Sequence, residues 1–420
     1  MKSLILAITF SLLTSGCEQS ASSTESHPTW FTDIRPLMNT YCTRCHSPQG
    51  AGPGDFSSLT EVELKADVML HYMLAGEMPP GASDPTCRNY IGSDHMVLSE
   101  QDTTLFKRWI EVGKPQGSIA NAPPLEAKTL ELKNPNLELR IQEPYAPQFL
   151  DPNNIGNEYR CFALSHNQRE TFYITALHPI VDQPHLVHHI VLFKSSSSLP
   201  DAYYSPTGAD CIDNMISNQV DGMIAGWAPG MHPIEFDEGL GIPVNPNESI
   251  FIQMHYFQNP KEGRPMVDQS GYAFRITPEP QNPVLMIPFG PEDFRIPAGD
   301  EEYSYSQTQD WGNNFPSVVL HGIFPHMHQL GSGYRMWVNR DSQETCLLES
   351  KNFHFDNQQT YMFAEPFEIR PGDKITFKCT WNNSVTNPKL VHTPPIDVFY
   401  GERTDEEMCF AFILGSISSF

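Results

Sequence analysis

The spacing of apolar residues predicts helices in the first quarter of the chain. Residues 31–41 form one such stretch, and residues 99–112 form a second that begins with a serine able to cap a helix. Apolar side chains in both recur every three or four positions, so each helix would bury one face. They are Ile34, Leu37, Met38 and Tyr41 in the first stretch and Leu105, Trp109 and Val112 in the second.

From about Thr129 onward the pattern changes to short alternating or apolar runs, which is typical of strands. Turn residues separate these runs at short intervals, as in β-sandwiches. The roughly 290 residues of this part are many for one sandwich and natural for two. We therefore predict a mainly β protein with two jelly-roll β-sandwich domains in tandem, residues 131–277 and 278–420, preceded by a small all-α domain. The clearest runs are 171–176, 187–193, 249–256, 318–324, 374–379 and 409–414.

Composition supports short strands and excludes one class of partner. The 37 prolines and 27 glycines suit strands joined by turns. The formal charge is −24, from 50 acidic and 26 basic residues. Nucleic acid is excluded as a partner because no basic surface is available to neutralise phosphates. We interpret the charge as a solvated acidic surface.

The first 17 residues have the features of an export signal. One lysine precedes an apolar run from Leu4 to Leu13 that is too short to span a bilayer. The sequence Thr14-Ser15-Gly16-Cys17 resembles a bacterial lipobox, which predicts that Cys17 becomes the lipidated N-terminus; the alternative is an ordinary secretory signal. Residues 18–27 would be a flexible tether. Glu18 favours a lipid anchor in the outer membrane of a Gram-negative bacterium, facing the periplasm, as the protein's sole membrane contact.

A haem-attachment motif, Cys42-Thr43-Arg44-Cys45-His46, follows the first predicted helix. In an exported CxxCH motif the two thiols bond the haem vinyl groups and the histidine binds the iron. A zinc knuckle would need a second ligand pair nearby. Residues 28–117 therefore look like a small class I cytochrome c with one covalently bound haem c, and residues 118–130 look like a linker.

Met78 is the preferred candidate for the second iron ligand. Two prolines follow it, which would end the preceding helix and hold the loop open. Methionines at helical spacing more often pack in a core than bind a metal. The rival candidates are Met69, His71, Met73 and Met96.

The remaining cysteines predict disulfides. Of nine cysteines, one would be lipidated and two would bind haem, which leaves six in an oxidising compartment. Six cysteines allow three disulfides but fifteen pairings. The six are Cys87, Cys161, Cys211, Cys346, Cys379 and Cys409.

Five histidines and one methionine can be grouped as two metal-ligand sets. Imidazole suits copper, and a thioether favours Cu(I). His326 and His328 are two apart, so in a strand both face one metal. His188 and His189 are adjacent, so shared ligation needs a bulge, a strand end or different ring nitrogens. A histidine pair also occurs by chance, and the other nearby histidines are more often structural; these are His178, His185, His232, His321 and His354.

Six landmarks in order resemble the type II copper monooxygenases that include dopamine β-hydroxylase and peptidylglycine α-hydroxylating monooxygenase. The resemblance covers roughly residues 159–414. The landmarks are Tyr159-Arg160-Cys161, His188-His189, residues 226–230, residues 253–256, His326-Met327-His328 and Glu407-Met408-Cys409.

The resemblance implies two copper ions with different tasks. The first, in the first sandwich, would transfer electrons. The second, in the second sandwich, would bind O2 and remove a hydrogen atom from the substrate, which makes its ligands catalytic. The resemblance also implies the disulfides Cys161–Cys211 and Cys379–Cys409, and offers no partner for Cys87 or Cys346. The implied ligands are His188, His189 and His255 for the first copper and His326, His328 and Met408 for the second.

The chain departs from the peptide-amidating members at three substrate positions. Phe324, Phe410 and Phe412 stand where those members have Arg, Asn and Tyr. Rings cannot make charge-assisted bonds to a carboxylate, so we expect no peptide amidation. If the rings line the pocket, the substrate is apolar or aromatic; otherwise they are core residues. Gln253 matches a residue near the first site and would orient water or substrate there, or be a satisfied polar strand residue.

We therefore expect a copper monooxygenase that uses O2 to hydroxylate a C–H bond of an apolar or aromatic small molecule. A periplasmic electron donor would supply electrons through the haem to the all-histidine copper. The alternatives are a non-catalytic copper-binding or electron-transfer periplasmic lipoprotein and, less favoured, a glycan-binding or glycan-processing module.

Overall fold

The computed structural model describes residues 27–48, 50–125, 130–150, 156–211, 222–258, 266–401, 403 and 405–418. The predicted leader, Cys17 and nearly all of the predicted tether lie outside these residues. The protein is mainly β, with a few helices near the N-terminus. Within the described part of the chain, no helix is long and apolar enough to cross a membrane.

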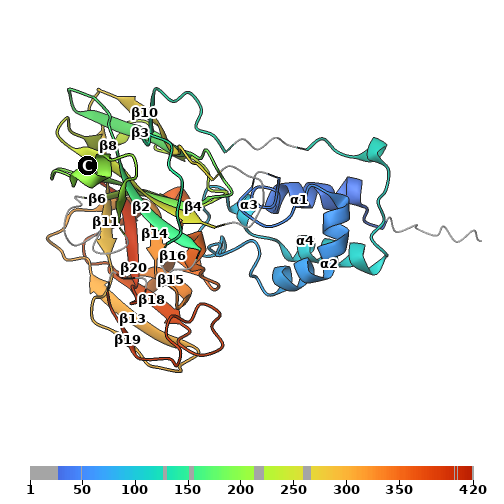
Figure 1. Cartoon of the computed structure of the whole chain (residues 1–420). Helices are drawn as coiled ribbons and strands as arrows, with labels where there is room; N and C mark the ends of the chain where they lie inside the picture. Colours follow the sequence, from blue (N-terminus) through green and yellow to red (C-terminus); the bar gives the residue numbers. More distant parts are fainter. Residues whose placement is uncertain are drawn as a thin grey trace, which may run out of the picture.

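Residues 27–125, here called the helical region, stand to one side of the strands (Figure 1). Its core is built from apolar faces, with Trp30, Phe106 and Trp109 buried together. Both predicted helices are present, and Ser99 caps the second by accepting a hydrogen bond from the Asp102 N–H at 3.1 Å. The elements are η1 Trp30–Ile34, α1 Arg35–Tyr41, α2 Leu59–Leu74, α3 Ser93–Met96, α4 Glu100–Glu111 and η2 Ile119–Asn121.

Strands β1 to β10 form the first β-region in the residues that the structure describes. One sheet has the order β5-β2-β9-β4-β6, and it packs face to face with β1-β10-β3-β8 through a core that includes Ile174, Phe274 and Ile252. β7 pairs with β3. The bounds are β1 Leu137–Arg140, β2 Asn157–Leu164, β3 Phe172–Ile180, β4 Val187–Ser195, β5 Ala209–Asp210, β6 Gly222–Trp227, β7 Ile234–Glu235, β8 Leu240–Val244, β9 Ser249–Phe257 and β10 Gly271–Thr277, with η3 Asp201–Tyr204 before β5.

Ten further strands form the second β-region. The order β11-β20-β14-β17 faces β13-β18-β15-β16 across a core that includes Ile323, Phe377 and Trp381, and β12 pairs with β19. The bounds are β11 Asn282–Phe289, β12 Arg295–Ile296, β13 Tyr303–Asp310, β14 Val318–His326, β15 Gly331–Arg340, β16 Gln343–Ser350, β17 Tyr361–Ile369, β18 Lys374–Trp381, β19 Val398–Phe399 and β20 Phe410–Ile417, with η4 Phe355–Asn357 before β17.

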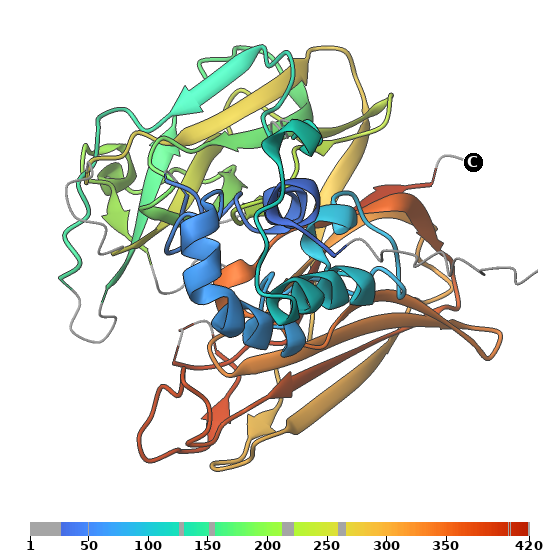
Figure 2. The same ribbon diagram turned by 90° about the vertical axis from the view of Figure 1, so that its right-hand side faces the viewer.

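A single sheet joins the two β-regions. β8 and β11 pair in parallel, with Leu240 opposite Asn282, so the order β1-β10-β3-β8-β11-β20-β14-β17 runs through both. The helical region lies across both groups of strands (Figure 2). The predicted boundary after residue 277 falls between β10 and β11.

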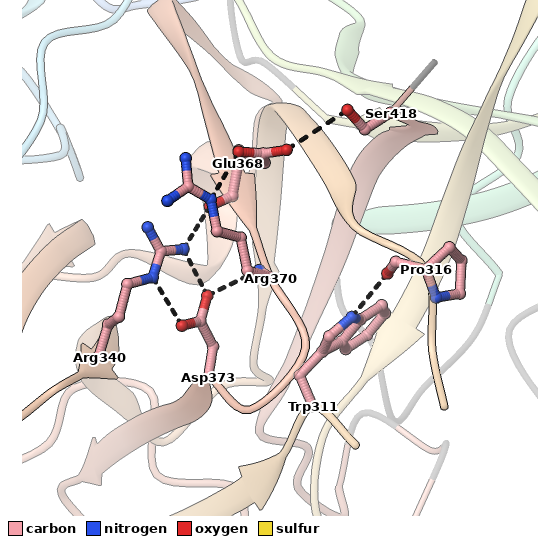
Figure 3. Close-up of polar contacts among 7 residues, drawn as sticks. All are labelled: Trp311, Pro316, Arg340, Glu368, Arg370, Asp373 and Ser418. Carbon is pink, nitrogen blue, oxygen red and sulfur yellow. Dashed lines mark hydrogen bonds and ion pairs between the residues drawn. The ribbon is translucent and has the colours of Figure 1, made fainter. Parts of the chain in front are cut away.

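An ion pair between a partly exposed arginine and a buried aspartate holds the ends of β15, β17 and β18 together (Figure 3). The Arg340 guanidinium donates two hydrogen bonds, at 2.7 and 2.6 Å, to the carboxylate of Asp373, which is 2% exposed. Burial works to raise the pKa of Asp373, but the hydrogen bonds from Arg340 and from the Arg370 backbone outweigh it, and the pKa is lowered. Trp311 packs beside this pair and donates its ring N–H to the carbonyl of Pro316 at 2.9 Å.

Three disulfides crosslink the residues that the structure describes. Cys161–Cys211 and Cys379–Cys409 are both present, and the second joins β18 to the residue before β20. The third, Cys87–Cys346, ties the helical region to β16. The described part of the chain leaves Cys42 and Cys45 as free thiols.

Candidate metal centres

Three histidines meet where β4 begins and β9 ends. His188 and His189 lie on β4, and His255 lies opposite His189 on β9. The pairing shifts between Val187 and His189, which gives the irregularity that two adjacent histidines need in order to face one point. One ligand atom from each ring lies within 4.8 Å of the others. The Nδ1 atoms converge, with His189 Nδ1 at 3.4 Å from that of His188 and at 3.2 Å from that of His255.

Neighbouring groups orient His255 of this first set and keep it neutral. Asn157 Oδ1 accepts a hydrogen bond from His255 Nε2 at 2.8 Å, which leaves the lone pair on His255 Nδ1 facing the other two rings. Tyr159 stacks on the His255 ring at 4.2 Å. Burial, and then the charges of His189 and His188, lower the pKa of His255 well below its ordinary value. The ring is therefore neutral at physiological pH, as a metal ligand must be.

The second set lies where β14 and β20 pair. Phe324 is opposite Phe412 and His326 is opposite Phe410, where the pairing ends. His328 follows His326 by two residues and Met408 precedes Phe410 by two, so continued alternation would place these rings and the thioether on one side of the sheet. The ring centroids of His326 and His328 are 5.1 Å apart, and Met408 is 1% exposed.

Hydrogen bonds fix both histidines of the second set. His326 Nδ1 lies 2.5 Å from Gln358 Oε1, and His328 Nδ1 lies 3.0 Å from the Glu406 carbonyl. Because Nδ1 donates in each case, Nε2 keeps its lone pair for a metal. Burial lowers the pKa of His326 to about 4. Burial, and then the charge of His326, lower the pKa of His328 to about 3. Two neutral imidazoles with a buried thioether fit copper.

Glu407 clamps the backbone around the second set. Its buried carboxylate accepts hydrogen bonds from the N–H groups of His328 at 2.9 Å and Leu330 at 2.7 Å, and from the Trp381 ring at 2.9 Å. The Met408 N–H adds a bond at 3.3 Å. Burial raises the pKa of Glu407 to about 7, although these hydrogen bonds act to lower it. The sequence had indicated Glu407 only as a landmark, and had given no sign of Asn157 or Gln358.

The three phenylalanines pack between the two β-regions. Phe324, Phe410 and Phe412 are 3%, 7% and 5% exposed, and they share an apolar cluster with Phe193 and Phe251 of the first β-region. The same cluster contains Met408, so the rings both pack the interface and surround the candidate thioether ligand.

Other polar candidates have ordinary partners. The Gln253 amide donates to the Cys211 carbonyl at 3.1 Å, as a satisfied strand residue does. His321 Nε2 lies 2.8 Å from the Ser416 hydroxyl rather than in either ligand set.

The CxxCH motif begins directly after α1. The backbone N–H of His46 donates to the Cys42 carbonyl at 2.8 Å, so the motif continues as helical turns. His46 Nδ1 lies 2.7 Å from the Pro53 carbonyl, and its ring stacks on Phe56 at 4.3 Å. Donation from Nδ1 selects the tautomer whose lone pair is on Nε2, the atom that would bind iron.

The surroundings of the motif also fit a haem. Met78 lies in the loop after α2 and is 41% exposed, which leaves its thioether accessible. Two free thiols, an imidazole and an accessible thioether are the groups that a covalently bound haem c requires.

Both ligand sets lie within segments that match one family. Models of the N-terminal and C-terminal domains of the copper type II ascorbate-dependent monooxygenases match residues 145–264 and 293–414. The chain belongs to this family, whose members are oxidoreductases. The helical region lies outside both matched segments.

Named relatives support the assignment at low identity. DBH-like monooxygenase protein 1 of Mus musculus is 26% identical over 285 residues, which is 62% of this chain and 44% of the relative. Peptidyl-glycine alpha-amidating monooxygenase A of Xenopus laevis is 25% identical over 246 residues, which is 54% of this chain and 23% of the relative. Dopamine beta-hydroxylase of Canis lupus familiaris is 23% identical over 264 residues, which is 57% of this chain and 40% of the relative. The chain therefore spans less than half the length of each of these relatives.

Proposed function

We propose that this protein is a monooxygenase that uses two copper ions and O2 to hydroxylate a C–H bond of an apolar or aromatic small molecule. The overall reaction converts C–H and O2, with two electrons and two protons, into C–OH and water. The observation that carries the proposal is the convergence of three histidines in one segment matched by a copper monooxygenase family, with two buried, hydrogen-bonded histidines and a buried methionine in the other.

The two sets would take different parts in the reaction. His188, His189 and His255 would hold the electron-transfer copper, since three imidazoles bind copper in both oxidation states. His326, His328 and Met408 would hold the catalytic copper, since the thioether favours Cu(I), the state that reacts with O2. Bound copper supplies the one-electron chemistry, while Asn157 and Gln358 orient rings of the two sets.

The substrate class follows from the residues beside the second set. Phe324, Phe410 and Phe412 offer apolar contact and no donor for a carboxylate. We therefore infer an apolar or aromatic substrate and no amidation of peptides. Turnover of a glycine-extended peptide by the purified protein would contradict this.

The helical region would supply electrons as a cytochrome c domain. Cys42, Cys45, His46 and Met78 would hold one haem c, and a periplasmic donor would reduce it. The leader and Cys17 would place the chain in the periplasm, anchored by lipid to the outer membrane. Haem staining and mass spectrometry of the N-terminal peptide test these two points.

Oxygen uptake with a reductant separates catalysis from copper storage. The copper-loaded protein should consume O2 in the presence of a substrate and form a hydroxylated product, identified by mass spectrometry of a lysate incubated with and without O2. Met408→Ala should lose this uptake, whereas Met266→Ala, a partly buried methionine that packs against the core of the first β-region, should retain it. Copper binding without substrate-dependent uptake would support the alternative, a copper-binding or electron-transfer lipoprotein.

A further inference from the structure

The segment from His354 to Tyr361 connects the helical region to the second ligand set. It comprises η4 and the residues leading into β17. On one side, Asn357 Nδ2 donates to the Pro80 carbonyl at 2.6 Å, and the Tyr361 hydroxyl donates to the Gly81 carbonyl at 2.7 Å. These carbonyls belong to the loop that follows Met78. Two hydrogen bonds therefore attach the segment to the loop that carries Met78, the candidate iron ligand.

On its other side the same segment reaches His326. Gln358 is 5% exposed, and its Nε2 donates to the Phe355 carbonyl at 3.0 Å. That bond uses the amide nitrogen, so Oε1 is the atom that faces His326 Nδ1 at 2.5 Å. An amide oxygen can only accept, so Nδ1 must carry the proton and Nε2 the lone pair. Gln358 therefore selects the tautomer that can bind a metal through Nε2.

The helical region is firmly joined to this part of the second β-region. Its residue Tyr90 forms a β-bridge with Phe363 of β17, and the Ile91 N–H donates to the Met362 carbonyl at 2.8 Å. The disulfide Cys87–Cys346 adds a covalent link to β16. A displacement of the loop at residues 78–81 would therefore be transmitted to the 354–361 segment.

We propose that Gln358 is a positioning residue for the second copper and that the helical region holds it in place through Asn357. Only two consecutive side chains, Asn357 and Gln358, separate the loop carbonyl of Pro80 from a ligand of the second set. The helical region thereby influences copper binding at His326, in addition to any role in electron delivery. This inference rests on the proposed copper site at His326, His328 and Met408.

The test measures copper at the second set alone. A full-length background protein with His188→Ala and His189→Ala removes two of the three ligands of the first set, so that bound copper reports the second. The two readouts are copper affinity, by competition with a chelator, and the electron paramagnetic resonance spectrum of bound Cu(II). In this background, Gln358→Met removes the acceptor at similar volume, Gln358→Glu keeps it, and Asn357→Leu breaks only the bond to Pro80.

We expect Gln358→Met to weaken copper binding about 10- to 100-fold, the usual effect of losing an outer hydrogen bond to a ligating histidine, and to change the Cu(II) spectrum. Gln358→Glu should retain both affinity and spectrum. Asn357→Leu should weaken binding in the same direction by a smaller factor. Gln359→Met is the matched control, because this neighbouring buried glutamine donates to the Tyr361 hydroxyl, at 3.4 Å, rather than to His326.

The outcomes separate this inference from the proposed function. Equal affinity and an equal spectrum for the background protein and Gln358→Met would overturn the role of Gln358. An effect of Gln358→Met with none from Asn357→Leu would overturn the coupling to the helical region. A background protein that binds no copper, with the first set intact in the native chain, would instead overturn the assignment of the second copper site.

Discussion

Replacing Gly226 with alanine should strain the contact between the two β-regions. Gly226 lies in β6, and an added Cβ would lie 2.7 and 2.9 Å from two ring carbons of Phe324 on β14, and closer still to a third. The ring has little freedom to move, because Phe324 is 3% exposed. Its ring centroid lies 5.9 Å from that of Phe412 and 6.1 Å from that of His326. We expect Gly226→Ala to lower the free energy of unfolding by about 2 kcal/mol, as overpacked cores do.

The cost should disappear when the ring is removed. Phe324→Ala alone should cost about 3–5 kcal/mol, since it empties a buried site. In that background the alanine methyl has room, so Gly226→Ala should change the free energy of unfolding by less than about 0.5 kcal/mol. The resulting coupling energy of about 1.5 kcal/mol or more exceeds the departures from additivity seen for independent sites, about 0.3–0.5 kcal/mol.

Urea unfolding of the native protein, both single variants and the double variant measures this coupling energy. Gly222→Ala is the matched control, because it lies on the same strand and an added Cβ there would meet no atom within 4 Å. It should leave stability nearly unchanged. An equal cost of Gly226→Ala with and without the Phe324 ring would refute the proposed contact.

Three further predictions address the rest of the protein. Burial, and then the charge of a neighbouring histidine, lower the pKa of His178 to about 4. The folded protein therefore binds this proton less tightly than the unfolded chain, so stability falls as the pH drops from about 6.5 toward 4. His178→Gln should reduce that fall in the free energy of unfolding by about 2 kcal/mol between pH 6.5 and 5. If urea unfolding gave the native protein and His178→Gln the same dependence of this free energy on pH, the lowered pKa of His178 would be contradicted. Asn157→Leu should weaken copper binding at the His255 set about 10- to 100-fold in a copper titration, and unchanged affinity would mean that its bond to His255 is dispensable. Replacing Cys87 and Cys346 with serine should lower the free energy of opening at the helical region's junction by about 3 kcal/mol, seen as roughly 100-fold faster hydrogen exchange in residues 84–91; unaltered exchange would show that hydrogen bonds alone hold the junction.

The parts of each site that are local in sequence could be predicted. The two-residue spacing of His326 and His328 places both rings on one face of any strand, whatever the rest of the fold. Adjacent His188 and His189 could share a metal through a bulge, a strand end or different ring nitrogens, and β4 has a register shift at that point. Alternation and helical spacing likewise depend on neighbouring residues, so the six clearest strand runs and the helices at 31–41 and 99–112 could be predicted.

The outer partners of the ligands could not be predicted, because they come from distant parts of the chain. Asn157 lies 98 residues before His255, and Gln358 lies 32 residues after His326. A single Asn or Gln has no periodic pattern that would mark it. The disulfide Cys87–Cys346 spans 259 residues and was one of many allowed pairings. The parallel pairing of β8 with β11, which makes one sheet of both β-regions, also depends on the completed fold.

X-ray absorption spectroscopy of the Cu(I)-loaded protein tests most directly whether the chain has two unequal copper sites. We predict two copper ions per chain, with sulfur scattering from one of them. That sulfur signal should be lost in Met408→Ala and retained when His188 and His189 are replaced by alanine, which should remove the copper without a sulfur ligand. One copper per chain, or a native spectrum without a copper–sulfur contribution, would contradict the proposed sites.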